Sequence, residues 1–305
     1  MTYDLVVIGA GPAGITAAIY AARKRLNTLV ITKDIGGQAA WSGDIENYIG
    51  YQFITGPDLV EKFEEHLRKY DIVLKENEAV QTVEKQGNKI KVKTDKAEYD
   101  SRTVIIACGK RSRELNVPGE KEFKNKGLTY CATCDGPLFS GKDVAVIGGG
   151  NSALDAALQL ANIARKVYII NNTVQLVGDE IMLEKLTGNT RVAVFNDARV
   201  LEVFGDKFVS GLKIKQQGRE QELTVQGVFV EIGLLPNSRI VPQAAKNVSA
   251  EIKVNFANET SIPAVFAAGD VTDVPEKQII IAAGEGAKAA LSAFRYLARN
   301  RFNQE

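Results

Sequence analysis

Residues that build metal sites and disulfide frameworks are scarce in this sequence. The 305 residues include 3 cysteines, 1 histidine and 1 tryptophan. A structural zinc site takes about four cysteine or histidine ligands, and a disulfide scaffold takes a higher density of cysteines. The sequence therefore predicts a protein stabilised by its core, with no metal site. The single histidine, His66, lies near the charged face of a predicted helix, and we interpret it as a surface residue rather than a catalytic base.

The chain also has no excess of one charge and no long hydrophobic run. Lys and Arg together number 38 and Asp and Glu together number 37, a balance that predicts no general attraction to nucleic acid or to an anionic membrane. No segment reaches the roughly 18 apolar residues of a membrane span. Residues 3–9 are typical of a buried strand entering a turn rather than of a signal peptide. We therefore expect a cytoplasmic protein without a nucleic-acid or membrane partner.

Apolar, β-branched runs alternate with helical patterns along the chain, which predicts an α/β fold with a mostly parallel, doubly wound architecture. The length favours about two domains. Helices are expected at Pro57–Tyr70 and from about Gly284 to Arg299, where apolar residues recur at helical spacing. The clearest predicted strands are Asp4–Ile8, Thr28–Thr32, Thr103–Ala107, Asp143–Ile147, Lys166–Ile170 and Val228–Ile232.

One glycine motif occurs twice, each time between a predicted strand and a predicted helix. In dinucleotide-binding folds its first glycine makes a tight turn, its second lets a pyrophosphate approach, and its third lets helix and strand pack closely. A duplicated fold without ligands is the alternative, but two copies in this setting favour two dinucleotide-binding units. The copies are Gly9-x-Gly11-x-x-Gly14 and Gly148-x-Gly150-x-x-Ala153.

The residues at the end of the second strand of each unit indicate which nucleotide the unit binds. A carboxylate at this position usually binds the adenosine ribose, whereas an arginine accommodates a 2′-phosphate. In the first unit the region is Lys33-Asp34, so Asp34 is the candidate carboxylate. In the second unit the region is Asn171-Asn172-Thr173, which offers neither a carboxylate nor an arginine.

The sequence Cys131-Ala-Thr-Cys134 lies between the two glycine motifs and is followed by Asp135-Gly-Pro. Zinc binding, a structural disulfide and a redox-active pair are the three interpretations. The shortage of further ligands argues against zinc, and a structural disulfide is unusual in a cytosolic protein. The close spacing lets a disulfide open and close with little backbone movement, which favours a redox pair. Asp135 is then a candidate acid or base, although Asp-Gly-Pro is also a turn sequence.

Taken in order, these motifs resemble those of the low-molecular-weight thioredoxin reductases, within the pyridine nucleotide–disulfide oxidoreductases. The resemblance covers essentially the full length. The second half is also similar to the flavoprotein part of alkyl hydroperoxide reductase, for example at Ile232-Gly-Leu-Leu-Pro-Asn237. The motifs that carry the resemblance are Gly9–Gly14, Gly36-Gly-Gln38, Cys131–Gly136, Gly148-Gly-Gly150, Val265–Asp270, Gln278 and Gly284-Glu-Gly286.

The resemblance implies an α/β fold of two Rossmann-like dinucleotide-binding domains, the second inserted in the first. Residues 1–113 plus 235–305 would form the FAD-binding domain, and residues 114–234 would form the NAD(P)H-binding domain that carries the C-x-x-C pair. The inserted domain would rotate about hinges near Arg111–Glu114 and Gly233–Pro236. The resemblance also implies a homodimer.

Cofactor-binding residues follow from the resemblance position by position. Asp270 would bond the ribityl chain of FAD, and Gln278 and Ile279 would cover the flavin. The other expected FAD-binding residues are Gly9, Gly11, Pro12, Ala13, Gly14, Asp34, Gly36, Gly37, Gln38, Asn47, Gly109 and Gly269. The expected nicotinamide-dinucleotide residues are Gly148, Gly150, Asn151, Ser152, Ala153 and Asn172.

The resemblance also assigns the three cysteines. Cys134 would face the flavin, Cys131 would attack the disulfide of a thioredoxin-like or glutaredoxin-like protein, Asp135 would donate a proton, and Cys108 would be structural. The acceptor would be a separate protein, since the sequence starts at its first Rossmann strand without the thioredoxin-like module of alkyl hydroperoxide reductase. A reductase of a peroxiredoxin system and a flavin-binding redox module without efficient turnover are the alternatives.

One departure from the family pattern concerns the electron donor. NADPH-dependent members carry His-Arg-Arg and a further Arg where this chain has Asn171-Asn-Thr173 and Val177. Because planar guanidinium groups recognise phosphate, their replacement predicts that NADH is preferred over NADPH. A flavoprotein fed by another donor, such as ferredoxin, is the weaker alternative, and the intact second glycine turn argues against it.

Overall fold

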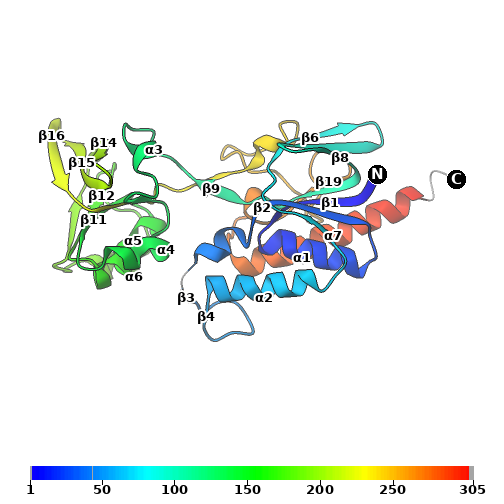
Figure 1. The fold of residues 1–305 in the computed structure, drawn as a ribbon, viewed down its shortest axis with the longest axis horizontal. Coiled ribbons are helices and arrows are strands. Elements are labelled where there is room, and N and C mark those ends of the chain that lie inside the picture. The colour runs from blue at the N-terminus through cyan, green and yellow to red at the C-terminus, as the bar shows by residue number, and fades with distance from the viewer. Residues whose placement is uncertain (1, 43, 302–305) are drawn as a thin grey trace. The chain divides into compact units, whose positions relative to one another are not determined.

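The structure is a computed structural model that describes residues 2–42 and 44–301, apart from the side chains of Trp41, Asp44, Cys134 and Arg301. The chain divides into two compact units, shown as ribbons in Figure 1. Unit 1 comprises Met1–Arg111 and Leu235–Glu305, and unit 2 comprises Ser112–Leu234. Each unit contains a parallel sheet flanked by helices, and unit 2 is inserted in the sequence of unit 1. The predicted fold class is therefore confirmed.

The core of unit 1 is a parallel sheet that two antiparallel strands extend. The strand order is β5-β2-β1-β8-β7-β6, and β19 also pairs with β8. The central strand β1 is buried on both faces, as its run of Leu5, Val6 and Val7 requires. The strands of this sheet are β1 (Thr2–Ala10), β2 (Thr28–Ile35), β5 (Val73–Lys75), β6 (Val80–Gln86), β7 (Lys89–Thr94), β8 (Glu98–Ile106) and β19 (Val265–Ala267).

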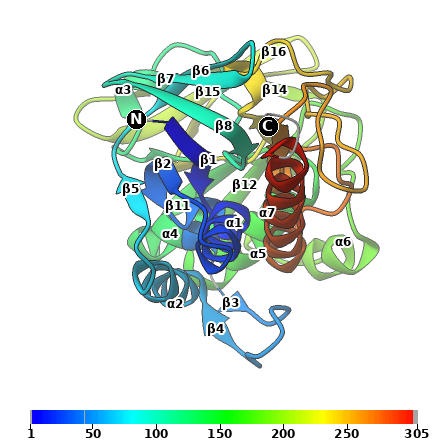
Figure 2. The ribbon, with the colours of Figure 1, turned by 90° about the vertical axis from the view of Figure 1, so that its right-hand side faces the viewer.

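Helices α1 (Pro12–Arg23) and α7 (Ile279–Arg301) pack side by side in unit 1 (Figure 2). Small residues let their backbones approach, because a Cβ atom at Gly286 would lie 2.0 Å from the carbonyl oxygen of Ala13. Helix α2 (Gly56–Arg68) confirms the helix predicted at Pro57–Tyr70. Its cap is Thr55 of the hairpin formed by β3 (Asp44–Ile45) and β4 (Ile54–Thr55), and 3-10 turns occur at Gly37–Trp41 and Gly269–Val271.

Unit 2 is built on the parallel strand order β10-β17-β11-β12-β13, beside the antiparallel order β14-β15-β16. Its parallel strands are β10 (Leu128–Thr129), β11 (Asp143–Ile147), β12 (Lys166–Ile170), β13 (Val192–Phe195) and β17 (Gly227–Val230). Its antiparallel strands are β14 (Ala198–Gly205), β15 (Val209–Gln216) and β16 (Arg219–Thr224). Its helices are α3 (Glu120–Phe123), α4 (Ala132–Asp135), α5 (Asn151–Ile163) and α6 (Glu180–Leu186), with a 3-10 turn at Gly136–Phe139.

Strands β9 (Lys110–Ser112) and β18 (Leu234–Pro236) pair with each other at the two points where the chain passes from one unit to the other. A further 3-10 turn, Ser238–Ile240, follows β18. In the described part of the chain, no helix combines the length and the apolar character that crossing a membrane requires.

Two predicted element ends are wrong in ways that matter for function. The strand predicted at Val228–Ile232 ends at Val230, so Glu231 lies just beyond it. Helix α7 begins at Ile279 rather than at Gly284. Its first residues are β-branched isoleucines, whose helix propensity is modest, so the sequence pattern hides the first turn. The surface position predicted for His66 is confirmed, since it is exposed on α2.

Candidate functional site

The first glycine turn connects β1 to α1, and its three glycines serve different purposes. At Gly9, φ is +102° and a Cβ atom would lie 2.4 Å from the carbonyl oxygen of Ala107. At Gly14, a Cβ atom would lie 1.8 Å from the carbonyl oxygen of Gly9. At Gly11, the nearest described chain atom to such a Cβ is the Gly36 oxygen, 3.8 Å away. The chain itself therefore excludes side chains at Gly9 and Gly14, whereas Gly11 leaves open space for a bound group.

The start of α1 offers free backbone donors to a group bound at Gly11. Gly11 is the N-cap and makes no side-chain cap hydrogen bond, and Pro12 occupies the first helical position. The N–H of Ile15 bonds the Gly11 carbonyl oxygen at 2.9 Å, so the regular helix pattern begins there. Helix N-termini attract anions through unsatisfied N–H groups and the helix dipole. The turn therefore fits the pyrophosphate of a dinucleotide.

Residues from distant segments gather around this turn. Gln38 Nε2 donates a hydrogen bond to Asp270 Oδ2 at 3.3 Å, and a Cβ atom at Gly109 would lie 4.0 Å from the same Nε2. Gly269 approaches α1, because its Cβ would lie 3.0 Å from the Cβ of Ala13. Burial raises the pKa of the Asp270 carboxyl, and the charges of two lysines, Lys277 and Lys110, oppose that rise.

The remaining residues expected at the first site lie at the same edge of the sheet or beside it. Asn47 Nδ2 donates to Gln278 Oε1 at 3.2 Å, which joins the segment after β3 to the segment before α7. Asp34 is exposed near the end of β2, where Ile35 pairs with Ala10. The turns after β1, β2, β8 and β19 thus meet at the carboxyl edge of the parallel strands, where ligands of open α/β sheets bind.

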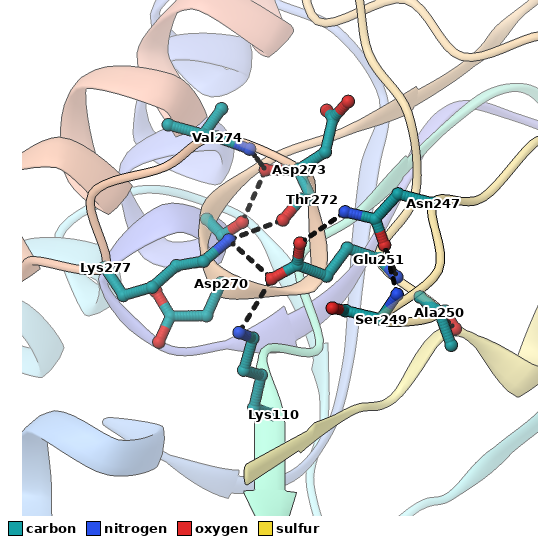
Figure 3. A network of polar contacts seen from close by, with 12 residues as sticks. Lys110, Asn247, Ser249, Ala250, Glu251, Asp270, Thr272, Asp273, Val274 and Lys277 are labelled. Atoms are coloured by element: carbon teal, nitrogen blue, oxygen red, sulfur yellow. Dashed lines mark hydrogen bonds and ion pairs between the residues drawn. The ribbon is translucent and has the colours of Figure 1, made fainter. Parts of the chain in front are cut away.

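An ion-pair network not foreseen from the sequence lies next to Asp270 (Figure 3). Glu251 Oε1 accepts from Lys110 Nζ at 2.8 Å and from Lys277 Nζ at 3.1 Å, and Asn247 Nδ2 donates to Glu251 Oε2 at 2.7 Å. Lys277 Nζ also donates to the Thr272 carbonyl oxygen at 2.6 Å. Burial opposes ionisation of Glu251, but the three donors outweigh it and lower its pKa to about 2. No motif spacing could have revealed these residues, since they come together only through the fold.

The second glycine turn connects β11 to α5 and repeats the plan of the first. At Gly148, φ is +140° and a Cβ atom would lie 2.2 Å from the carbonyl oxygen of Glu231. At Gly150, the nearest described chain atom to such a Cβ is the Val177 oxygen, 3.7 Å away. Ala153 takes the third position and is fully buried. Gly150 therefore leaves open space, as Gly11 does.

The loop after β12 lies against this turn and presents neutral side chains. Asn171 is buried; its Nδ2 donates to Asn196 Oδ1 at 2.8 Å, and its Oδ1 accepts from Thr173 Oγ1 at 2.9 Å. Asn172 and Val177 are exposed. Asn171 therefore shapes the loop, whereas the side chain of Asn172 is exposed. Residues 171–180 contain no lysine and no arginine.

The first two residues of α5, Asn151 and Ser152, differ in their hydrogen bonding. Asn151 Oδ1 accepts a hydrogen bond from the backbone N–H of Asp179 at 2.8 Å, which ties α5 to the loop after β12. Ser152 is exposed. At this turn the side chain of Asn151 therefore has a hydrogen-bond partner among the described residues, whereas no such bond is described for Ser152.

The C-x-x-C segment follows β10 and contains the short helix α4. The backbone N–H of Cys131 donates to Thr129 Oγ1 at 3.2 Å, and that hydroxyl donates to Asp135 Oδ2. Thr129 thus connects the first cysteine to the candidate acid. The side chain of Cys134 lies outside the described residues. Thr133 Oγ1 donates to Gln159 Oε1 at 2.9 Å, which ties the middle of the motif to α5.

Cys108 belongs to unit 1, whereas the C-x-x-C segment belongs to unit 2. It is a free cysteine two residues beyond β8, and its Sγ lies 3.4 Å from the carbonyl oxygen of Asn237. Burial raises the pKa of its thiol to about 12. Such a thiol is unreactive at neutral pH, in keeping with the structural role expected for it.

Comparison with known proteins places the chain in a family. It matches the family model described as pyridine nucleotide-disulphide oxidoreductase over residues 3–286. It is 44% identical over 301 residues to a protein named NADH dehydrogenase of Bacillus subtilis (strain 168), and 42% identical over 302 residues to an alkyl hydroperoxide reductase subunit of Staphylococcus epidermidis. Each match covers 98% of this chain but only 59% and 60%, respectively, of the relative. Thioredoxin reductase of Lactococcus lactis is 34% identical, with a TM-score of 0.88 over 97% of this chain and 99% of that chain.

Two dinucleotide-binding folds and a C-x-x-C segment are the features expected of a pyridine nucleotide–disulphide oxidoreductase. The chain belongs to the pyridine nucleotide–disulphide oxidoreductase family, and within that family its fold is similar to that of thioredoxin reductase. It spans about three-fifths of the length of the curated relatives it matches.

The substitution Glu251→Gln tests the network of Figure 3. The pKa of Glu251 is about 2 in the folded protein, against an ordinary value of 4.5, so its charge stabilises unit 1 above pH 4.5 and this contribution disappears as the pH falls through 2. We expect the variant to lose about 3 kcal/mol of unfolding free energy at pH 7. Urea unfolding followed by the fluorescence of the single tryptophan, which belongs to unit 1, measures this loss.

The matched control is Glu276→Gln, because Glu276 is an exposed acid on the segment that precedes α7. The control variant keeps the stability of the wild type at every pH. A difference between wild type and Glu251→Gln that does not shrink from pH 5 to pH 2 contradicts the assigned electrostatic role.

Proposed function

We propose that this chain carries electrons from NADH, through FAD bound to unit 1, to a disulfide formed by Cys131 and Cys134, and from there to a thioredoxin-like or glutaredoxin-like protein. The observation that carries the proposal is the repeated open glycine. A Cβ atom at Gly11 in unit 1, or at Gly150 in unit 2, would meet no atom of the described residues closer than 3.7 Å, and unit 2 adds the cysteine pair. Two nucleotide sites and one thiol pair are the parts that such electron transfer needs.

The FAD site would be formed at the carboxyl edge of the unit 1 sheet. The pyrophosphate would lie on the start of α1, Asp34 would bond the adenosine ribose, and Asp270 with Gln38 would hold the ribityl chain. Bound there, FAD would supply two-electron chemistry between the nicotinamide and the disulfide. The residues proposed to surround it are Gly9, Gly11, Pro12, Ala13, Gly14, Asp34, Gly36, Gly37, Gln38, Asn47, Gly109, Gly269, Asp270, Gln278 and Ile279.

The nicotinamide dinucleotide would bind unit 2 at the second turn. Its pyrophosphate would lie at Gly148, Gly150 and the N-terminus of α5, beside Asn151, Ser152 and Ala153. Asn172 would meet the adenosine ribose. The exposed side chains of Asn172 and Val177 supply no positive charge for a 2′-phosphate, which supports NADH as the preferred donor.

The cysteine pair would pass electrons on by thiol–disulfide exchange. The Cys131 thiolate would attack the partner disulfide and form a mixed disulfide, which Cys134 would resolve while the partner leaves as a dithiol. Asp135, held through Thr129, would supply and take up the proton at the cysteines. A peroxiredoxin-linked acceptor is the second candidate, because a component of alkyl hydroperoxide reductase is among the similar proteins.

Gly11→Ala separates the fold from the cofactor site. A Cβ atom at Gly11 would have no described chain atom closer than 3.8 Å, so the variant should fold. The methyl group would occupy the approach of the pyrophosphate, and we expect the affinity for FAD to fall at least about tenfold, which is about 1.4 kcal/mol. Thermal unfolding of the flavin-free chain and titration with FAD measure the two effects.

The contrasting variant is Gly14→Ala, whose Cβ would lie 1.8 Å from the Gly9 oxygen and should therefore destabilise the fold itself. Unchanged FAD affinity in a folded Gly11→Ala protein contradicts the proposed pyrophosphate site.

Anaerobic reduction of the flavin-loaded protein tests the electron donor. We expect NADH to bleach the flavin absorbance quickly and NADPH slowly, followed by steady NADH consumption when a disulfide-containing thioredoxin or glutaredoxin is added. Asn172→Arg combined with Val177→Arg should improve use of NADPH by about tenfold or more, since each charge-assisted hydrogen bond to phosphate contributes about 1.5–3 kcal/mol.

The control pair, Asn172→Gln with Val177→Leu, adds length without charge and should leave the preference for NADH unchanged. If neither nucleotide bleaches the flavin, the assignment of the second turn to a nicotinamide dinucleotide is wrong.

A further inference from the structure

The end of β17 lies between the cysteine pair and the second glycine turn. β17 pairs with β10 on one side and with β11 on the other. In the register of these strands Thr129 is opposite Phe229, and Ile147 is opposite Val230. Strand β10 continues toward the C-x-x-C segment, and β11 continues into the glycine turn. The residue that follows β17, Glu231, therefore has a functional segment on each side.

Glu231 contacts both of these segments. Its N–H donates to the Ile147 carbonyl oxygen at 2.8 Å, and its own carbonyl oxygen would lie 2.2 Å from a Cβ at Gly148. Its carboxylate lies close enough to the backbone N–H of Ala132, the first residue of α4, for that N–H to lower the pKa of the carboxylate. The backbone of Glu231 thus supports the nucleotide turn, while its side chain lies near the start of the redox helix.

The surroundings of this carboxylate disfavour a negative charge. Burial raises the pKa of Glu231 to about 7, the Ala132 N–H opposes the rise, and the charge of Asp155 on α5 adds to it. The other titratable groups on the adjoining elements are the two cysteines and Asp135 of the C-x-x-C segment, Tyr130 just before that segment, and Asp143 at the start of β11. Strand β10, the Gly148–Gly150 turn and residues 232–234 carry no titratable side chain. Glu231 therefore changes its charge in the pH range in which the enzyme would work.

We propose that Glu231 is a positioning residue for the Cys131–Cys134 pair, and that its carboxylate takes up a proton when the pair is reduced. This inference rests on the proposed function. Two electrons and one proton open the disulfide to one thiol and one thiolate, with the electrons supplied by the nicotinamide nucleotide through FAD. The new thiolate charge draws a second proton from solvent onto Glu231, so that the site gains two electrons and two protons in all.

This coupling has a defined pH window. Below about pH 7 Glu231 is protonated whether the pair is oxidised or reduced, so it adds nothing to the proton count. Above that pH its carboxylate, near the start of the redox helix, is charged while the pair is oxidised, and it takes up a proton on reduction because the thiolate raises its pKa further. The reduction potential of the pair should therefore fall more steeply with pH above 7 than it would without this carboxylate.

The experiment equilibrates the flavin-loaded full chain with dithiothreitol redox buffers from pH 6 to pH 8.5, and then traps the thiols by alkylation for mass spectrometry. Glu231→Gln keeps an oxygen for the Ala132 N–H but cannot ionise. We expect its pair to take up about one proton fewer per two electrons above pH 7. At pH 8 we expect it to be reduced about fivefold more readily, which corresponds to about 20 mV.

Asp155→Asn provides the second arm, because Asp155 faces Glu231 without belonging to the redox pair. Removing its charge lowers the pKa of Glu231, so the steep region should begin at a lower pH than in the wild type. This arm decides the question if Glu231→Gln does not fold.

The outcomes distinguish the inference from the function on which it rests. A wild-type pair that never exchanges with dithiothreitol contradicts the proposed function itself. If the pair exchanges but its potential has the same pH dependence in wild type and in Glu231→Gln, only the role of Glu231 is overturned. The same holds for Asp155→Asn when Glu231→Gln does not fold. A change seen in Glu231→Ala but absent in Glu231→Gln would reveal a purely structural hydrogen bond and would also overturn the proton coupling.

Discussion

In each unit the glycine turn, which follows β1 in unit 1 and β11 in unit 2, presses against the backbone just beyond a neighbouring strand. A side chain at Gly9 would collide with the backbone of Ala107, and one at Gly148 would collide with the backbone of Glu231. This contact fixes the path of the chain into α1 and α5 and leaves Gly11 and Gly150 facing open space. The proposed phosphate sites depend on this contact, because they consist of little more than the glycine turn and the helix start that it orients.

Parallel strands then bring the remaining functional groups to the same edge. In unit 1 the turns after β8 and β19 deliver Gly109 and Asp270 next to Gln38, and the network around Glu251 supports the loop that carries Asp270. In unit 2 the turns after β10, β17 and β11 deliver the cysteine segment, Glu231 and the second glycine turn in that order. The second unit thus combines a nucleotide turn with a thiol pair by adding one short strand beside β17.

Much of this arrangement could be predicted from the sequence, for a physical reason. Glycine turns, alternating strands and a C-x-x-C pair are local patterns, and each is set by the geometry of a few consecutive residues. The ion pairs of Glu251 with Lys110 and Lys277 are different, because they join residues far apart in sequence and follow no spacing rule. Glu231 could have been noticed in the sequence, because a carboxylate within the apolar run Val228–Ile232 is unusual. The prediction of one strand over that whole run hides it.

The position at which β17 ends decides where Glu231 lies. Because β17 ends at Val230, Glu231 leaves the regular sheet and turns its carboxylate to Ala132. Boundaries of this kind are set by tertiary contacts, here the hydrogen bond of Glu231 to Ile147 and the close approach to Gly148, rather than by the propensity of the residues themselves.

Counting the electrons that the protein accepts tests the central claim most directly. Anaerobic titration of the flavin-loaded chain with NADH should consume about two equivalents per flavin, one for FAD and one for the Cys131–Cys134 disulfide, and should expose about two new thiols. Cys131→Ser should consume about one equivalent and expose none. A wild-type protein that stops at one equivalent with no new thiols would contradict the electron path from NADH through FAD to the cysteine pair.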